Sequence, residues 1–242
     1  MTYCVGMLLD AGIVMLSDTR TNAGMDDVST YRKMFIFEDP GERVLTIMTA
    51  GNLSVTQTVI SRIEEAAEDP EATEKTSILL APTLFQAIEI IGNVLSDVAS
   101  DIAAKVRRMD QATNATASMI IGGQRRNGRM HLYRLYTEGN FIEATEDTPY
   151  LQIGEHKYGK PILDRVVTPK TSLEDARKAV LLSMDSTLRS NLSVGMPLDY
   201  VLMKKDDCKV TRQDRIEADD EAFKAMSDAW SQALRDSFAA VP

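Results

Sequence analysis

The chain has 242 residues, of which 44% are hydrophobic and 26% charged, and its formal net charge is −9. This composition is typical of a soluble globular protein, and the negative charge argues against nucleic acid or an anionic membrane surface as a partner. No run of about 18 apolar residues is present, so we expect no transmembrane helix. The first residues have neither a basic nor an apolar signal-peptide region, so we expect a cytoplasmic protein.

The beginning of the chain has the pattern of β-strands. Residues 3–9 and 12–16 are two apolar runs joined by an Asp-Ala-Gly turn, which predicts a tight hairpin. Both runs are apolar almost throughout, as expected for strands that are covered on both faces. A polar stretch over residues 17–32 follows, and further strands are predicted at 34–37 and 44–49.

Two helices are predicted next. Apolar residues recur at helical spacing over residues 53–67, and more regularly from residue 83 to about 108. We expect the two helices to lie antiparallel on one face of a sheet. Their apolar stripe is interpreted as core packing and not as a cofactor site.

The pattern then returns to strands, which are separated by Gly-Gly, Asn-Gly and Glu-Gly-Asn breaks. These strands are predicted at 117–121, 130–136, 141–144 and 150–153. A helix begins with capping-box spacing at Ser172. It is followed by strands at 200–203 and 208–216, and by an amphipathic helix at about 219–238.

The order of elements predicts an α+β fold. Strands and helices come in groups and do not alternate one by one, which argues against a doubly wound parallel sheet. Two antiparallel sheets between helix layers fit this order better. No linker, repeat or low-complexity run is present, so we expect a single domain over residues 1–242.

The cysteines and histidines are few. Cys4 and Cys208 form no motif, and we expect each to be a buried free thiol. His131 and His156 have no metal-binding spacing with each other or with the cysteines. We therefore expect neither a metal nor another cofactor.

Thr2 is the candidate nucleophile. A hydroxyl needs a nearby base, and a chain-terminal threonine carries one in its own α-amine, whose pKa is about 8. Removal of Met1 would expose that amine, since the residue after it is small. Thr2 leads directly into the first predicted strand, which would fix the chain start in a core.

Asp18, Arg20 and Lys33 are candidates for supporting this nucleophile. Lys33 as a cation would lower the proton affinity of the Thr2 amine and hydroxyl, and Asp18 would hold Lys33 and compensate its charge. Spacing alone favours the alternative, in which these three residues form solvated surface ion pairs.

Several ordered blocks resemble proteasome β-type subunits, which are N-terminal-nucleophile hydrolases. The blocks shared with that family cover residues 2–6, 17–24, 33, 49–52, 120–123 and 150–154. Three more blocks look particularly similar to the bacterial proteasome-related group called Anbu, and they cover residues 29–34, 154–161 and 189–195.

The resemblance implies a four-layer αββα sandwich and a set of roles. Thr2 would be the nucleophile and, through its amine, the general base, with Asp18 and Lys33 as the supporting pair. Gly51 would offer a backbone N–H to the oxyanion, and glycine suits a place that substrate approaches closely. The implied reaction is acyl transfer to Thr2 followed by hydrolysis of the ester.

The chain also departs from the family pattern. Proteasome subunits usually place a serine after the glycine equivalent to Gly154, and this chain has Glu155 there. A second supporting pair of the family maps onto Asp185 and either Ser190 or Ser193.

The leading hypothesis is a threonine peptidase that acts on peptides or unfolded protein. The alternatives are a self-assembling scaffold of the same fold without useful turnover and an amidase for non-peptide substrates. The resemblance also implies a homo-oligomer, arranged as a ring or an open ring. In the C-terminal helix, Trp230 and Phe238 would dock a neighbouring copy or pack on their own domain. No ATPase-docking segment is readable, so an ATPase partner stays open.

Overall fold

Two five-stranded antiparallel sheets form the centre of the computed structural model, which describes residues 1–22, 28–108 and 115–241. The first sheet has the strand order β10-β1-β2-β11-β12. Its strands are β1 (Tyr3–Leu9), β2 (Gly12–Asp18), β10 (Tyr150–Gly154), β11 (Leu198–Lys204) and β12 (Arg212–Ile216). The predicted hairpin is formed by β1 and β2, whose register pairs Leu9 with Gly12.

The second sheet has the order β5-β6-β7-β8-β9. Its strands are β5 (Met34–Asp39), β6 (Arg43–Gly51), β7 (Ala117–Arg125), β8 (His131–Leu135) and β9 (Phe141–Glu143). A separate two-stranded sheet pairs β3 (Arg20–Asn22) with β4 (Val28–Thr30). It lies within the predicted polar stretch of residues 17–32, of which residues 23–27 are outside the described residues.

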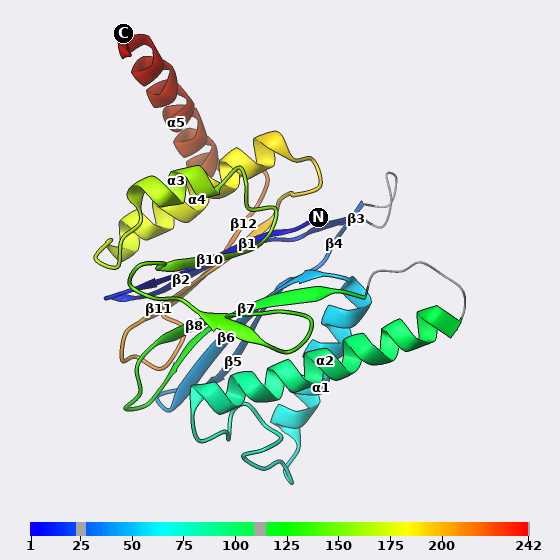
Figure 1. Ribbon diagram of the computed structural model, residues 1–242. Helices are drawn as coiled ribbons and strands as arrows, with labels where there is room; N and C mark the ends of the chain where they lie inside the picture. The colour runs from blue at the N-terminus through cyan, green and yellow to red at the C-terminus, as the bar shows by residue number, and fades with distance from the viewer. Residues whose placement is uncertain (23–27, 109–114, 242) are drawn as a thin grey trace.

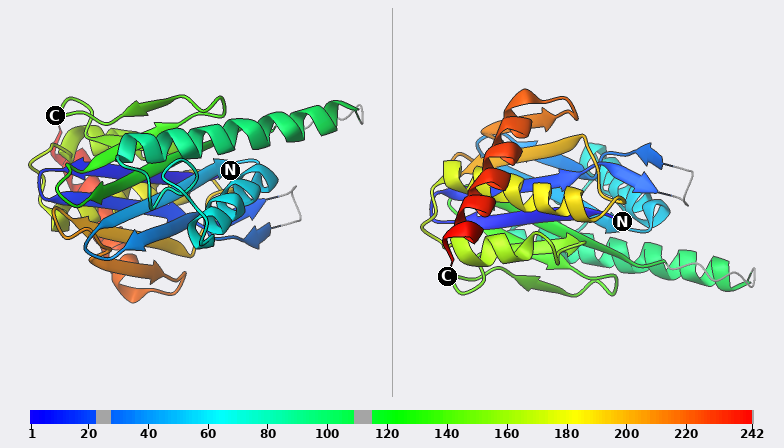
Figure 2. Two further views of the ribbon diagram at one scale, coloured as in Figure 1. Left: turned by 90° about the horizontal axis from the view of Figure 1, so that it is seen from below. Right: turned by 90° about the horizontal axis from the view of Figure 1, so that it is seen from above.

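Helices cover the outer face of each sheet (Figure 1). The helices are α1 (Leu53–Glu68), α2 (Leu84–Arg108), α3 (Lys160–Val166), α4 (Leu173–Ser190) and α5 (Glu221–Ala240). One apolar core lies between α1, α2 and the second sheet, and another lies between α3, α4 and the first sheet. Figure 2 shows these two helix layers from below and from above.

A third apolar core fills the space between the two sheets. It includes Cys4, Ile13, Met48, Ile120 and Val201, which come from five strands of both sheets. Strands that face a helix layer on one side and this core on the other are apolar along their whole length, which explains the continuous apolar runs in the sequence. The α+β, four-layer αββα architecture is therefore confirmed.

Some predicted boundaries differ from the observed ones. β2 continues to Asp18 because β11 pairs with it as far as the Asp18–Leu198 pair. The last strand begins at Arg212 and not at Cys208, since Cys208 has φ +46° in the turn that precedes the strand. Cys4 and Cys208 are both buried and free, as expected.

The C-terminal helix α5 projects away from the layers (Figure 1). Ser227 is its buried residue, whereas Leu234 and Phe238 are exposed. Its first turn is capped by Asp220, which accepts a hydrogen bond from the Phe223 N–H at 2.7 Å. Among the described residues, no helix combines the length and the apolar character that crossing a membrane requires.

Candidate active site

The start of the chain is held inside the first sheet, where β1 lies between β10 and β2. Tyr3 pairs with Gly154, and the Glu155 N–H donates a hydrogen bond to the Thr2 carbonyl oxygen at 2.7 Å. Gly154 has φ +79°, and a Cβ at this position would lie 1.9 Å from the Thr2 carbonyl oxygen. A glycine is therefore required at this close approach. These contacts fix Thr2 in place, with its side chain half-buried.

Asp18 and Lys33 form a buried ion pair beside Thr2. The Lys33 Nζ lies 2.8 Å from the Asp18 Oδ1, and the two residues are 4% and 0% exposed. Asp18 also accepts hydrogen bonds from the Tyr3 N–H at 3.1 Å and the Gly195 N–H at 3.2 Å. Lys33 donates a second hydrogen bond to the Arg20 carbonyl oxygen at 2.6 Å. The alternative of solvated surface ion pairs is therefore wrong for Asp18 and Lys33.

The surroundings of Asp18 act on its pKa in two directions. Burial raises the pKa of this carboxyl, because the charged form loses its hydration. Lys33 and the N–H donors of Tyr3 and Gly195 oppose that rise. A buried pair is tolerated when its remaining hydrogen-bonding groups are satisfied in this way.

Arg20 holds the loop that follows α4. Its Nη1 donates to the Leu192 carbonyl oxygen at 2.9 Å, and a Cβ on Gly195 would lie 2.2 Å from its Nε. The same loop supplies the Gly195 N–H to Asp18. Ser193 lies in this loop, and its N–H donates to the Asn191 Oδ1 at 2.9 Å. Arg20 therefore contacts the loop whose Gly195 N–H binds Asp18.

The side chains of the other predicted supporting residues point to different partners. Glu155 accepts a hydrogen bond from the Asn191 Nδ2 at 3.2 Å. Asp185 accepts from the Ser227 Oγ at 2.7 Å and from the Arg189 Nε at 3.2 Å, so its bonds connect α4 to α5. Ser190 is the last residue of α4.

A cavity of about 220 Å³ opens beside Thr2. We call it the near cavity. Thr2, Lys33 and Gly51 line it together, whereas Asp185, Ser190 and Ser193 do not. Its described walls are Met1, Thr2, Thr21, Lys33, Thr49, Ala50, Gly51, Leu53, Thr56 and Gly154.

Gly51 is positioned by the junction between β6 and α1. It has φ +114°, and a Cβ there would lie 2.5 Å from the Thr116 carbonyl oxygen. The next residue, Asn52, is the N-cap of α1 and accepts a hydrogen bond from the Val55 N–H at 3.2 Å. The backbone at Gly51 is thus fixed on both sides, in a conformation that glycine adopts most readily.

The charges of Lys33 and Asp18 also act on the pKa of the Met1 α-amine. Burial lowers its pKa, Lys33 lowers it further, and Asp18 acts in the opposite direction. An amine in this position therefore loses its proton more readily than an exposed chain terminus.

The sequence interpretation missed part of the site. Gly195 and Asn191 belong to the block of residues 189–195 that carries the resemblance, but no role was assigned to them. Their contacts to Asp18 and Glu155 span 177 and 36 residues, so spacing along the chain gives no sign of them. Thr21 and Leu53 as cavity walls were also missed.

Comparisons with known proteins identify the family of the chain. The family described as proteasome subunit matches residues 2–199. A comparison with the curated proteins found no match. Three similar solved structures are Anbu proteins, and each aligns over nearly the whole chain.

The structure described as the helical assembly of the Anbu complex from Pseudomonas aeruginosa is 43% identical, with a TM-score of 0.92, and the match covers 99% of this chain and 97% of that one. An Anbu (Gly-1) mutant from Hyphomicrobium sp. strain MC1 is 46% identical, with a TM-score of 0.91 and coverages of 100% and 98%. Anbu (ancestral beta-subunit) from Yersinia bercovieri is 41% identical, with a TM-score of 0.91 and coverages of 99% and 97%. The chain belongs to the proteasome subunit family and, within it, to the Anbu group.

Proposed function

We propose that the protein is a threonine-type peptide hydrolase in which Thr2 is the N-terminal nucleophile after removal of Met1. The observation that carries this proposal is the position of Lys33. It lines the near cavity together with Thr2, while its ammonium is held by the buried Asp18. A buried cation beside a half-buried hydroxyl suits nucleophilic catalysis, whereas a purely structural ion pair has no need of a cavity.

The two bonds of Lys33 orient its third N–H. An ammonium has three donors, and among the described residues two of them are used by Asp18 and by the Arg20 carbonyl oxygen. The remaining donor would face the near cavity, which Lys33 lines. There it would stabilise the Thr2 oxygen as its proton leaves.

The proposed reaction has two steps. In the first, the Thr2 α-amine takes the hydroxyl proton while Oγ attacks the peptide carbonyl carbon. The developing oxyanion would be bound by the Gly51 N–H. The C–N bond then breaks, the departing amine receives the proton, and an ester to Thr2 remains. In the second step water, deprotonated by the amine, hydrolyses the ester and restores Thr2.

The amine must be unprotonated to act as the base. A free α-amine has a pKa of about 8, and the pKa of the Met1 amine is lowered by burial and by Lys33. A freed Thr2 amine at the same end of β1 would be subject to both effects. It would therefore be active as a base near neutral pH.

The remaining supporting residues have indirect roles in this proposal. Arg20 and Ser193 would hold the loop that binds Asp18, and Glu155 would hold Thr2 through its backbone N–H. Asp185 and Ser190 would act on the site only through α4.

The test is turnover of a diverse peptide library followed by mass spectrometry. We expect new termini with the wild-type chain after Met1 removal, and none with Thr2→Ala. Thr2→Ser would retain part of the turnover, because the amine and a hydroxyl are both kept. Turnover that persists in Thr2→Ala would overturn the assignment of the nucleophile.

A self-assembling scaffold without turnover is the second candidate function. This candidate requires that Met1 is retained, in which case Met1 lines the near cavity next to Thr2. A chain that retains Met1 has no free amine at Thr2. Intact mass decides whether Met1 is present in the purified protein.

We further propose that the protein is a homo-oligomer and that α5 contributes to the contact between copies. Leu234 and Phe238 are 51% and 85% exposed on the projecting part of this helix. Trp230 continues the same apolar stripe towards the body of the protein, where it is partly buried. Phe238→Asp would reduce the assembled mass measured by light scattering, whereas Ala225→Asp, at an exposed position on the opposite face of the helix, would not.

A further inference from the structure

A second cavity adjoins the active site on the other side of Gly51. It has a volume of about 330 Å³ and shares Ala50, Gly51 and Gly154 with the near cavity. We call it the far cavity. Its other described walls are Thr116, Ala117, Ser118, Tyr136, Thr137 and Glu138.

Two glycines belong to the wall that the two cavities share. A Cβ on Gly51 would lie 2.5 Å from the Thr116 carbonyl oxygen, and a Cβ on Gly154 would lie 1.9 Å from the Thr2 carbonyl oxygen. Both residues also have a positive φ, which side chains rarely adopt. At these two positions the shared wall is therefore bare backbone, and Ala50 is its third member. A chain bound at Thr2 in the near cavity would pass Gly51 to reach the far one.

The charges of the two cavities are opposite. Lys33 is the charged side chain of the near cavity, and its ammonium is already bound by Asp18. Glu138 is the charged side chain among the described walls of the far cavity. Within the described residues, Glu138 has no ion-pair partner, so its carboxylate is available to a ligand.

The turn that carries Glu138 is fixed by its backbone. The Gly139 N–H donates to the Tyr136 carbonyl oxygen, and the Tyr136 N–H donates to the Asn140 carbonyl oxygen, both at 2.9 Å. The Thr137 Oγ1 donates to the Ala117 carbonyl oxygen at 2.7 Å. Gly139 also packs directly on Gly92 of α2. A Cβ on Gly92 would lie 2.5 Å from the Gly139 carbonyl oxygen. The carboxylate is thus presented from a rigid turn.

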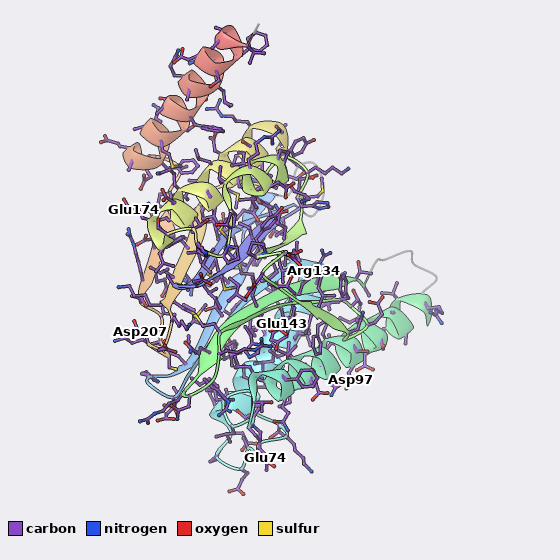
Figure 3. The ribbon with its side chains drawn as sticks, turned by 60° about the vertical axis from the view of Figure 1, so that its left-hand side comes forward. Glu74, Asp97, Arg134, Glu143, Glu174 and Asp207 are labelled. Atoms are coloured by element: carbon purple, nitrogen blue, oxygen red, sulfur yellow. The ribbon has the colours of Figure 1, made fainter. Side chains whose placement is uncertain are left out.

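One cation lies close to this wall. The Arg134 guanidinium stacks on the Tyr136 ring, 4.9 Å from the ring centroid, and does not line the far cavity. Figure 3 labels Arg134 on the strand that precedes the turn. Arg134 is therefore not among the described walls of the far cavity, and Glu138 is the charged residue that lines it.

From this arrangement we propose that the far cavity is a subsite for a lysine or arginine side chain of a peptide whose scissile bond lies at Thr2. The proposal rests on the proposed function for the identity of the ligand as a peptide. The carboxylate of Glu138 would pair with the cationic head group, and the ring of Tyr136 would contact its apolar stem. The net charge of −9 adds a general attraction for basic peptides.

The test uses capped hexapeptides that are identical except for one lysine or norleucine, placed in turn at each position on both sides of a central Ala–Ala bond. Binding is measured with Thr2→Ala protein, which cannot turn the peptides over. We expect lysine to bind about two- to fivefold more tightly than norleucine on one side of the bond at low salt, and added salt to reduce the difference.

Matched variants connect the preference to Glu138. In the Thr2→Ala background, Glu138→Gln would abolish the lysine preference. Glu146→Gln would leave it unchanged, because Glu146 is an exposed carboxylate outside the walls of both cavities. Equal affinity for lysine and norleucine at every position, or a preference that survives Glu138→Gln, would overturn the proposal.

The binding measurement also separates this inference from the proposed function. If the Thr2 protein cleaves none of the peptides while the lysine preference depends on Glu138, the peptidase assignment fails and the subsite stands. If the peptides are cleaved without any such preference, the peptidase assignment stands and the subsite fails.

Discussion

Replacement of Lys33 by methionine tests the buried ion pair directly. The change keeps most of the side-chain volume and removes the charge, so that the Asp18 carboxylate is left buried with only the Tyr3 and Gly195 N–H donors. Removing one partner of a buried pair typically costs about 3–5 kcal/mol. Asp18 is fully buried and Lys33 is 4% exposed, so solvent screening does not reduce this figure much. We expect a loss of about 3–5 kcal/mol in the free energy of unfolding at pH 8.

The loss should depend on pH in a defined direction. Burial already raises the pKa of Asp18, and Lys33 is the largest influence that opposes the rise. Without Lys33 the pKa of Asp18 rises further. A group whose pKa is higher in the folded state stabilises that state at low pH, and the stabilisation is lost as pH rises through the folded pKa. Lys33→Met should therefore be less damaging at pH 5.5 than at pH 8.

The assay is urea unfolding followed by circular dichroism at both pH values, with the chain concentration fixed because assembly shifts apparent stability. Lys160→Met is the control, since the Lys160–Asp164 pair is about half exposed. It should cost less than about 1 kcal/mol. A loss below about 1 kcal/mol for Lys33→Met, or the same loss at both pH values, would refute the assignment of a desolvated pair.

Three further predictions concern the site and the core. Gly51→Ala should lower kcat/KM about a hundredfold or more by displacing the oxyanion donor, which steady-state kinetics with a library-derived peptide would measure; an unchanged rate would argue against that role. The kcat/KM of the protein with a free Thr2 amine should rise with pH through a pKa below about 8, because burial and Lys33 lower the pKa of an amine at this chain start. A pH–rate profile with its midpoint above 8 would contradict this. Ile91→Ala should cost about 2–5 kcal/mol of unfolding free energy, since Ile91 is fully buried in the core under α2; a loss below 1 kcal/mol in urea unfolding would show that the core relaxes around the cavity.

Local sequence patterns predicted most of the fold. The apolar runs of β1 and β2 and the regular spacing of α2 are strong signals, because burial on one or two faces imposes a period on the chain. β3 was not predicted, because it is short and polar and lies in a small separate sheet.

The site was less accessible to sequence reasoning. Spacing suggested that Asp18 and Lys33 are solvated, and only the resemblance placed them beside Thr2. The buried Asp18 accepts a hydrogen bond from the Gly195 N–H, which lies 177 residues further along the chain. The projection of α5 could not be predicted either, since an amphipathic stripe shows that a face is apolar and not what covers it.

The most direct test of the central claim is the intact mass of the purified protein before and after incubation with a peptide epoxyketone. This reagent requires both the hydroxyl and the free amine of a terminal threonine. We predict loss of the Met1 mass, then a single adduct that is absent in Thr2→Ala. A chain with Thr2 exposed that forms no adduct, or an adduct that persists in Thr2→Ala, would contradict the assignment of Thr2 as the nucleophile.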